Sequence, residues 1–391
     1  MQHEYQYVVL GLGGIGSGAV YWLSRQFGSD VLGLEQFALG HENGGSQDHS
    51  RIIRVSYGHR HYIEFAKRSF ATWAEVEQDC GEQLVILSGG LDLFPVETDI
   101  NIENYKASLT ACDVPFELLN AAEVMERFPQ FTLTDDVVGI YQAQAGIATA
   151  ARANAAHIRM ARSYGATIRD NAPVSAIRPI GDEFEIEAGG EVYRCEKLII
   201  TAGAWTNNAL AHFGMKLPLT VTKEQVSYFT GDNPADFAPG RFPIWIWQAL
   251  PRMYGLPAFG VDGMGMKIGA DAIGKPVTPE TRTFEVDAEA YQQTIDWMAK
   301  YTPSALGDLL YTKTCLYTLT PDREFIIDTL PDYPNCAVGV GAGHAFKFAS
   351  VFGRVLGELV TTGETSTAIS HFTIDRPILL EENPMLDVTG A

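Results

Sequence analysis

The sequence reads YVVLGLGGIGSGAVYWLSRQFGSDVLGLEQ from Tyr7 to Gln36, and this stretch decides the fold. A short apolar run over 7–10 predicts a buried strand, a helical pattern follows over 19–23, and a second apolar run over 31–34 predicts another strand. Glycines spaced G-x-G-x-x-G lie between the first strand and the helix, and an acidic residue ends the second strand. Together these parts predict a βαβ unit that binds a dinucleotide.

Each part of this unit has a physical role. Gly11 permits a tight turn, Gly13 lets the backbone approach a pyrophosphate, and Gly16 lets the helix pack closely on the strand. The helix N-terminus offers free N–H groups and a positive dipole end to phosphates. Glu35, about 20 residues after Gly16, can accept hydrogen bonds from ribose hydroxyls and would repel a 2′-phosphate. The motif argues against NADP, but it does not distinguish FAD from NAD. The alternative to a dinucleotide site is a glycine-rich turn in an ordinary βαβ unit.

Composition limits the partners and the compartment. The formal net charge of -20 argues against nucleic acid or an anionic membrane as a partner. It also means that any site for a carboxylate must be locally basic. The five cysteines, without a C-x-x-C pair, predict neither a disulfide framework nor a metal site. Without a signal-like N-terminus or an apolar run of about 20 residues, we expect a cytoplasmic, monomeric protein that does not bind membranes.

Two arginines follow the first unit in the run Ser50-Arg51-Ile52-Ile53-Arg54. At helical spacing Arg51 and Arg54 would share a face. Each can hold a carboxylate or a phosphate in a bidentate fork. A surface pair with salt-bridge partners is the alternative, and the neighbouring glycine-rich loop favours a binding role.

Four motifs, in this order, resemble the monomeric sarcosine oxidase family of flavin amine oxidases. The motifs are S-R-I-I-R over 50–54, T-A-G-A-W over 201–205, C-L-Y-T over 315–318 followed by E-F-I-I-D over 324–328, and G-A-G-H-A-F-K-F over 341–348. The resemblance extends from the N-terminal glycines to about residue 377. It implies an oxidase that takes a hydride from a sarcosine-like secondary amino acid onto FAD and then reduces O2 to H2O2.

The resemblance also implies an α/β fold with two domains. A glutathione-reductase-like, FAD-binding Rossmann domain would comprise residues 1–85, 146–216 and 314–391. An inserted domain with an antiparallel β-sheet, over 86–145 and 217–313, would bind the substrate. Strand-like segments dominate from about residue 217 to 313, over 225–229, 244–247, 253–256 and 264–269, which agrees with this insertion. Before it, an alternating run over 192–195 and an apolar run over 198–200 predict separate short strands.

Residue roles are implied position by position. Lys267 resembles the lysine that activates oxygen near flavin N5, and Arg51 the arginine beside the flavin. Arg54 and Lys347 match the pair that binds the substrate carboxylate, and the cysteine that bonds covalently to the flavin is matched by Cys315. Residues expected to line the substrate pocket are Tyr254, Tyr317 and Asp271. Residues expected to bind the cofactor are Gly11, Gly13, Gly14, Ile15, Gly16, Glu35, Gln36, Ser50, Arg51, Val174, Ala202, Gly203, Trp205, Cys315, Gly343, His344 and Lys347. No metal ligand is expected.

Two segments depart from the family pattern. Asp271 stands where sarcosine oxidases have a histidine, which implies a pocket that could hold a cationic or polyhydroxylated group. The run Gln47-Asp48-His49 replaces a histidine-glycine pattern. Three alternatives therefore stay open: a fructosyl amino acid (Amadori) oxidase, a flavin dehydrogenase that uses an acceptor other than O2, and an FAD-binding protein without catalysis.

Overall fold

The N-terminal unit folds as its sequence pattern predicts. In the computed structural model, which describes residues 3–261 and 265–387, strand β1 (Glu4–Leu10) leads into helix α1 (Gly14–Phe27) and then into β2 (Val31–Leu34). β1 and β2 pair in parallel, with Tyr7 opposite Val31 and Leu10 opposite Leu34. β2 and residues 7–10 of β1 are buried on both faces, which explains their continuous apolar runs.

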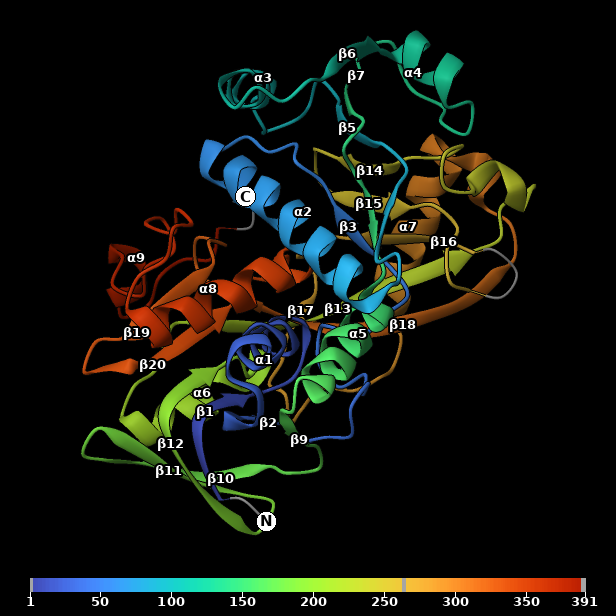
Figure 1. Cartoon of the computed structure of the whole chain (residues 1–391). Helices are drawn as coiled ribbons and strands as arrows, with labels where there is room; N and C mark the ends of the chain where they lie inside the picture. The colour runs from blue at the N-terminus through green and yellow to red at the C-terminus, as the bar shows by residue number, and fades with distance from the viewer. Residues whose placement is uncertain (1–2, 262–264, 388–391) are drawn as a thin grey trace.

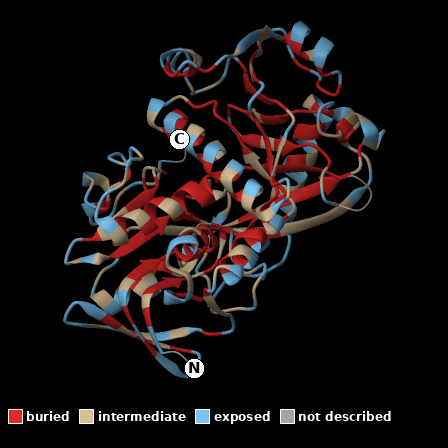
Figure 2. Cartoon of the chain, in the orientation of Figure 1, coloured by how far each residue is buried: buried red, intermediate tan, exposed pale blue. Residues whose placement is uncertain are grey.

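The described strands form three sheets, and the first of them is built around this parallel core. Its order is β10-β11-β12-β1-β2-β9, and β20 extends it beside β12 and pairs with β19. β12 pairs in parallel with both β1 and β20, whereas β10 and β11 form an antiparallel extension. The added strands are β9 (Thr167–Arg169), β10 (Val174–Ile180), β11 (Glu183–Ala188), β12 (Glu191–Ile200), β19 (Ile326–Leu330) and β20 (Tyr333–Val340). Figure 2 shows the parallel core as buried and the β10–β11 hairpin as partly exposed.

Helices pack tightly against this sheet. α1 contacts both α5 (Ala150–Ser163) and α8 (Ala349–Thr362), and α2 (Arg60–Cys80) lies beside α8, as Figure 1 shows. The approach of α1 to α8 depends on glycine. A Cβ on Gly18 would lie 2.6 Å from the Ala349 carbonyl oxygen, and one on Gly353 would lie 2.3 Å from Ala19 N. The two backbones are therefore closer than any side chain permits.

The second sheet forms the upper part of the molecule in Figure 1. Its order is β17-β13-β16-β15-β14-β5-β7-β6, with β18 paired to β13. Its strands are β5 (Gly90–Phe94), β6 (Glu117–Asn120), β7 (Val138–Gln142), β13 (Thr220–Phe229), β14 (Ile244–Trp247), β15 (Met253–Leu256), β16 (Met266–Ala270), β17 (Lys275–Pro276) and β18 (Leu309–Leu319). Helices α3 (Ile102–Ala111), α4 (Ala121–Arg127) and α7 (Ala288–Tyr301) accompany it, and the short α6 (Thr206–Leu210) and α9 (Pro377–Leu380) lie elsewhere. The strand predicted over 264–269 is β16, and residue 264 lies outside the described residues.

Two local predictions were wrong. Arg51 lies on a strand, β3 (Arg51–Ile53), which joins β4 (Val85–Leu87) and β8 (Gly146–Ala148) in the third sheet, so the two arginines share no helix. The segments 192–195 and 198–200 are not separate strands but one strand, β12. Polar residues Glu196 and Lys197 interrupt the apolar pattern there, while the backbone pairing with β1 continues through Lys197.

β18 connects the two main sheets. It pairs with β13 over most of its length, and the chain then returns to the first sheet through β19 and β20. The strand therefore crosses the domain boundary expected at residue 314. None of the helices in the described ranges is both long enough and apolar enough to cross a membrane.

Candidate active site

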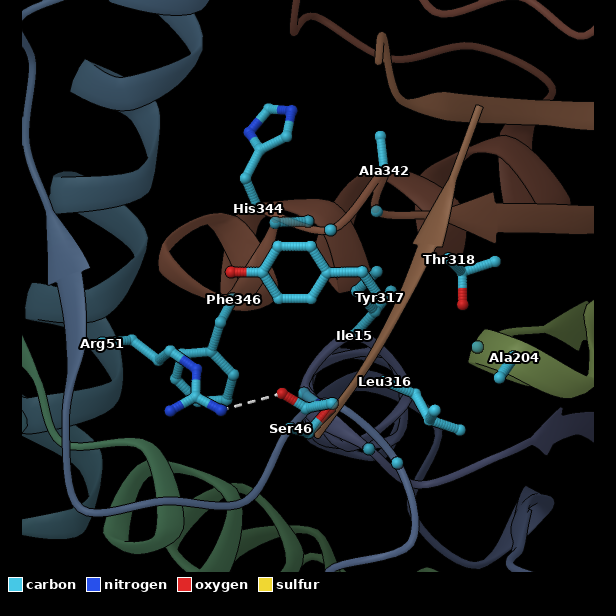
Figure 3. A pocket seen from close by; sticks show the side chains of 18 of the residues that line it. Ile15, Ser46, Arg51, Ala204, Leu316, Tyr317, Thr318, Ala342, His344 and Phe346 are labelled. Carbon is cyan, nitrogen blue, oxygen red and sulfur yellow. Dashed lines mark hydrogen bonds between the residues drawn. The ribbon is translucent and has the colours of Figure 1, made fainter. Parts of the chain in front are cut away.

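A cavity of about 930 Å³ opens at the carboxyl ends of the parallel strands and continues to the second sheet. Leu10, Leu34, Thr201 and Gly341, which end or directly follow β1, β2, β12 and β20, all line it. Open α/β sheets bind ligands at this edge. Figure 3 shows part of the cavity, with Arg51, Tyr317 and His344 on different sides of it.

The glycines at one end leave room only for backbone. Gly11 has φ +83°, and a Cβ there would lie 2.6 Å from the Thr201 carbonyl oxygen. A Cβ on Gly13 would lie 2.8 Å from Ser46 Oγ, and one on Gly16 only 1.8 Å from the Gly11 carbonyl oxygen. Gly11 and Gly13 line the cavity, whereas Gly16 packs the helix onto the strand. The turn at Gly11 and the close packing at Gly16 agree with the glycine motif, and the approach of Gly13 to a pyrophosphate stays a prediction.

Glu35 lines the cavity at the end of β2 as a buried carboxylate. Its oxygens accept hydrogen bonds from Leu12 N at 2.8 Å and Phe37 N at 3.1 Å, and His41 Nε2 lies 3.3 Å away. Burial alone would raise the pKa of Glu35, but these three donors outweigh it and lower the pKa. The carboxylate is therefore ionised and fixed where ribose hydroxyls could donate to it. With the glycine cradle, it fits the adenosine half of a dinucleotide.

Two buried cations face one aromatic ring at the other end of the cavity. The Arg54 guanidinium lies 4.4 Å and Lys347 Nζ 6.0 Å from the Tyr57 ring centre. Arg54 Nη1 donates to Asp92 Oδ1 at 2.7 Å, while Lys347 Nζ donates to the His344 carbonyl at 2.9 Å. Arg54 Nε is buried and has no hydrogen-bond partner among the residues that the structure describes. A carboxylate would therefore find unused donors here.

The charge on Lys347 depends on its surroundings. Burial, and then the nearby Arg54 and Arg323 charges, lower its pKa to about 7, although Asp271 opposes them. Because the pKa of Lys347 is lowered, the side chain is partly neutral near pH 7. An anion bound beside it would raise the pKa and restore the charge. The arrangement at Arg54 and Lys347 is the locally basic site that an acidic protein needs for an anionic ligand.

Asp271 is already paired. Arg323 Nη1 donates to Asp271 Oδ2 at 2.9 Å, and both residues line the cavity. Arg323 has φ +56°, a conformation that side-chain-bearing residues rarely adopt, and its Nε has no hydrogen-bond partner within 3–261 and 265–387. Burial would raise the pKa of Asp271, but Arg323 and then His344 and Lys347 outweigh it and lower the pKa. Asp271 is therefore an ionised, paired carboxylate.

Lys267 and Arg51 share a buried partner, Asp48. Lys267 Nζ lies 2.5 Å and Arg51 Nη1 2.9 Å from Asp48 Oδ2. Lys267 also donates to the Ser50 carbonyl at 2.9 Å. Lys267 and Arg51 line the cavity, so the structure brings the two predicted catalytic side chains together.

Most predicted site residues line this one cavity, and three do not. The lining residues include Gly11, Gly13, Gly14, Ile15, Glu35, Gln36, Arg51, Arg54, Val174, Ala202, Gly203, Trp205, Tyr254, Lys267, Asp271, Tyr317, Gly343, His344 and Lys347. Gly16, Ser50 and Cys315 are not among them. Cys315 lies on β18 opposite Glu224, next to the lining residue Leu316, and burial raises the pKa of its thiol.

Three polar residues at this site had no predicted role. Asp48, Asp92 and Arg323 each form an ion pair with a predicted site residue. A buried charge needs a partner of opposite charge, so a partner is expected for each of the predicted residues Lys267, Arg54 and Asp271. The sequence does not reveal which charged residue supplies each partner.

The fold and the cavity define a dinucleotide-dependent enzyme with an anion-binding site. Comparison with known proteins specifies the class, because the family model "FAD dependent oxidoreductase" matches residues 6–359. The monomeric sarcosine oxidase of Streptomyces avermitilis is 33% identical over 95% of this chain and 97% of its own length. The human peroxisomal sarcosine oxidase is 31% identical over 94% of this chain and 95% of its own length.

A solved structure is similar over the same range. NikD, described as an unusual amino acid oxidase essential for nikkomycin biosynthesis, superposes with a TM-score of 0.84 at 25% identity, over 95% of this chain and 98% of its own. The protein is an FAD-dependent oxidoreductase. It belongs to the monomeric sarcosine oxidase family, so the predicted family and Rossmann-type fold are confirmed.

Proposed function

We propose that the protein oxidises the CH–NH bond of a secondary amino acid, such as an N-methyl or cyclic amino acid, with FAD and O2. The observation that carries this proposal is the pair of buried cations, Arg54 and Lys347, in the cavity that begins at the dinucleotide-binding glycines. The names of the sarcosine oxidase relatives support the same chemistry.

The chain's own residues bind and orient the substrate. Arg54 and Lys347 hold the carboxylate, and Tyr57 forms the aromatic floor beneath both cations. Tyr254 and Tyr317 border the rest of the pocket. The two cations also disfavour a protonated amine, and the neutral amine is the reactive form. FAD, which the glycine loop and Glu35 would hold by its adenosine half, would supply the redox chemistry for a two-electron oxidation of the amine at the expense of O2. We assign no side-chain base.

Lys267 supports the use of O2. Its buried ammonium group lines the cavity and can stabilise negative charge that develops as O2 is reduced to H2O2. A dehydrogenase with another electron acceptor is the alternative. One mole of H2O2 per mole of amine consumed under air would support the oxidase. Turnover that needs an artificial acceptor would support the dehydrogenase.

We also propose that Cys315 bonds covalently to the flavin, as its motif suggests. Denaturation of the purified protein should leave the yellow flavin attached to the chain. It should release the flavin from the Cys315→Ala variant. Cys112→Ala, which changes a buried cysteine far along the chain from the cavity motifs, is the matched control and should retain it. Free flavin from the denatured wild type would refute the linkage.

An anaerobic screen of candidate amines identifies which of them the protein oxidises. Sarcosine, pipecolate, N-methyltryptophan and fructosyl-glycine would each be mixed with the oxidised protein, and loss of the flavin colour would be followed. We expect at least one of the first three to bleach the flavin. The fructosyl alternative rested on Asp271, and the Arg323 pair already occupies that carboxylate. Failure of every amine would overturn the proposed function.

The domain boundaries at residues 85/86, 145/146, 216/217 and 313/314, a monomeric state and a cytoplasmic location remain proposals. The separation of most strands into two main sheets supports the domain boundaries. Gel filtration of the purified protein and fractionation of cells would test the other two.

A further inference from the structure

We propose that Asp48 is a positioning residue that keeps the buried ammonium group of Lys267 charged and directed into the cavity. This inference deepens the proposed oxidase function and rests on it. It concerns a residue that touches neither substrate nor cofactor in the site described above, since Asp48 does not line the cavity.

Asp48 is held from several directions. Besides Lys267 and Arg51, its carboxylate accepts a hydrogen bond from Tyr228 OH at 2.5 Å, and Lys313 Nζ lies 3.3 Å away. Its own Oδ1 accepts from His49 N at 2.8 Å. The side chain is 1% exposed. Burial would raise the pKa of Asp48, but Lys267, Arg51 and Lys313 outweigh it and hold the pKa well below its ordinary range.

Lys267 needs this carboxylate. Its side chain is 2% exposed, and the Arg51 charge lies beside it. Burial, and then Arg51, lower the pKa of Lys267 to about 8, against the opposing effect of Asp48. Without Asp48, two buried like charges would face each other, and Lys267 could most readily relieve the repulsion by losing its proton.

Other ionisable groups around Lys267 come from every neighbouring strand. Tyr228 on β13 has its ring centre 5.9 Å from Lys267 Nζ, and Tyr311 on β18 stacks on Tyr228. Burial raises the pKa of both phenols and of the Cys315 thiol. Burial also raises the pKa of Tyr254 on β15. Lys313 forms ion pairs with both the exposed Glu42 and the buried Asp48. The phenols stay neutral near pH 8, and Cys315 is neutral both as a thiol and as a thioether to the flavin, so Asp48 is the carboxylate that balances Lys267 and Arg51.

The test is the pH dependence of flavin reoxidation in the Asp48→Asn variant. The holoenzyme would be reduced with dithionite under anaerobic conditions and mixed with oxygenated buffer, so that no amine substrate is needed. In the wild type the rate should fall as pH rises through about 8, where Lys267 loses its proton. In Asp48→Asn this midpoint should move to lower pH by at least about one unit, the smaller end of the effect of an adjacent opposite charge.

A second readout does not depend on activity. Sulfite adds to oxidised flavin as an anion, so its affinity reports positive charge in the site. We expect sulfite affinity to weaken with the same pH midpoint as the reoxidation rate in each protein. Asp48→Glu, which keeps the charge, should restore a midpoint near that of the wild type. Asp48→Ser removes the charge but leaves a hydroxyl acceptor, and it replaces Asp48→Asn if that variant cannot be purified with flavin.

The double variant Asp48→Asn/Lys267→Met shows whether Asp48 affects the pH midpoint through Lys267 or through another group. Lys267→Met should abolish the midpoint, and adding Asp48→Asn should then change nothing further. The proposal is overturned if Asp48→Asn keeps the wild-type midpoint, or if its effect persists in the Lys267→Met background. Failure of every amine to reduce the flavin would refute the oxidase function while leaving this test intact.

Discussion

Lys347 forms no ion pair with a carboxylate in the described part of the chain, which sets it apart from Arg54 beside it. Its described hydrogen bond goes to the His344 carbonyl, whereas Arg54 is neutralised by Asp92. Replacing Lys347 with Gln removes a charge-assisted hydrogen bond worth about 1.5–3 kcal/mol. We therefore expect the dissociation constant of a simple carboxylate, such as acetate, to rise roughly 10- to 100-fold.

The measurement is a titration of the oxidised protein followed by the flavin spectrum. Lys106→Gln is the matched control, because Lys106 pairs with Glu103 on the surface of α3. Equal affinities in Lys347→Gln and wild type would place the carboxylate elsewhere.

The pH dependence of this binding follows from the same side chain. Since the pKa of Lys347 is about 7 in the free site, its ammonium is fully present below that pH and lost above it. Acetate stays ionised throughout this range. Affinity should therefore be constant below pH 7 and fall as pH rises beyond it, by up to about tenfold per unit. Isothermal titration across this range would check it, and the slope should vanish in Lys347→Gln.

At the scale of elements, two glycines on α8 make opposite predictions. A Cβ on Gly353 would lie 2.3 Å from Ala19 N, whereas one on Gly357 would lie 3.4 Å from Leu23 Cδ2, an ordinary contact. Gly353→Ala should force α1 and α8 apart and destabilise the protein by about 1–3 kcal/mol. Gly357→Ala should be neutral or stabilise it by up to about 1 kcal/mol, because alanine favours helix.

Thermal unfolding of the two holoproteins, with flavin release as a parallel signal, distinguishes them. Because α1 begins at the dinucleotide-binding glycines, the Gly353→Ala variant should also release flavin at lower temperature. Indistinguishable midpoints for the two variants would contradict the packing described for α1 and α8.

The elements with strong patterns could be predicted from sequence, and the ion pairs could not. β2, β14 and β15 begin and end at the predicted residues, since their apolar runs coincide with buried strands. The sequence predicts two strands where the structure has the single strand β12, because Glu196 and Lys197 interrupt the apolar pattern. The backbone pairing with β1 continues through Lys197. Asp92 lies on β5 and Arg54 directly follows β3, 38 residues earlier in the chain, so only the tertiary structure reveals their pair. The family resemblance placed the cations, but it did not indicate that Asp48 would join them.

At the scale of the whole molecule, the charge of the protein opposes the charge of its site. The net charge is -20, while Arg54 and Lys347 make the anion site locally positive. An anionic ligand is therefore repelled at long range and attracted only near the cavity. Raising the salt concentration should increase the association rate constant of acetate, because screening reduces the long-range repulsion.

Stopped-flow binding at low and at about 0.15 M ionic strength would measure this effect. The reaction of the reduced protein with O2 is the control, because O2 is uncharged and its rate should not depend on salt. An acetate association rate that falls with salt would instead show that the local cations dominate even at a distance.

The order of the strands along the chain also has a consequence for biosynthesis. β1 and β2 are translated before β12 and β20, which complete their sheet, and α1 is translated before its packing partner α8 (Figure 1). The glycine loop is thus made more than 300 residues before α8, which packs against the helix that follows it. Until then the nascent chain exposes an unfinished parallel sheet, whose unpaired edge is open to misassociation. We therefore expect flavin to bind stably only after α8 has been synthesised and has packed against α1.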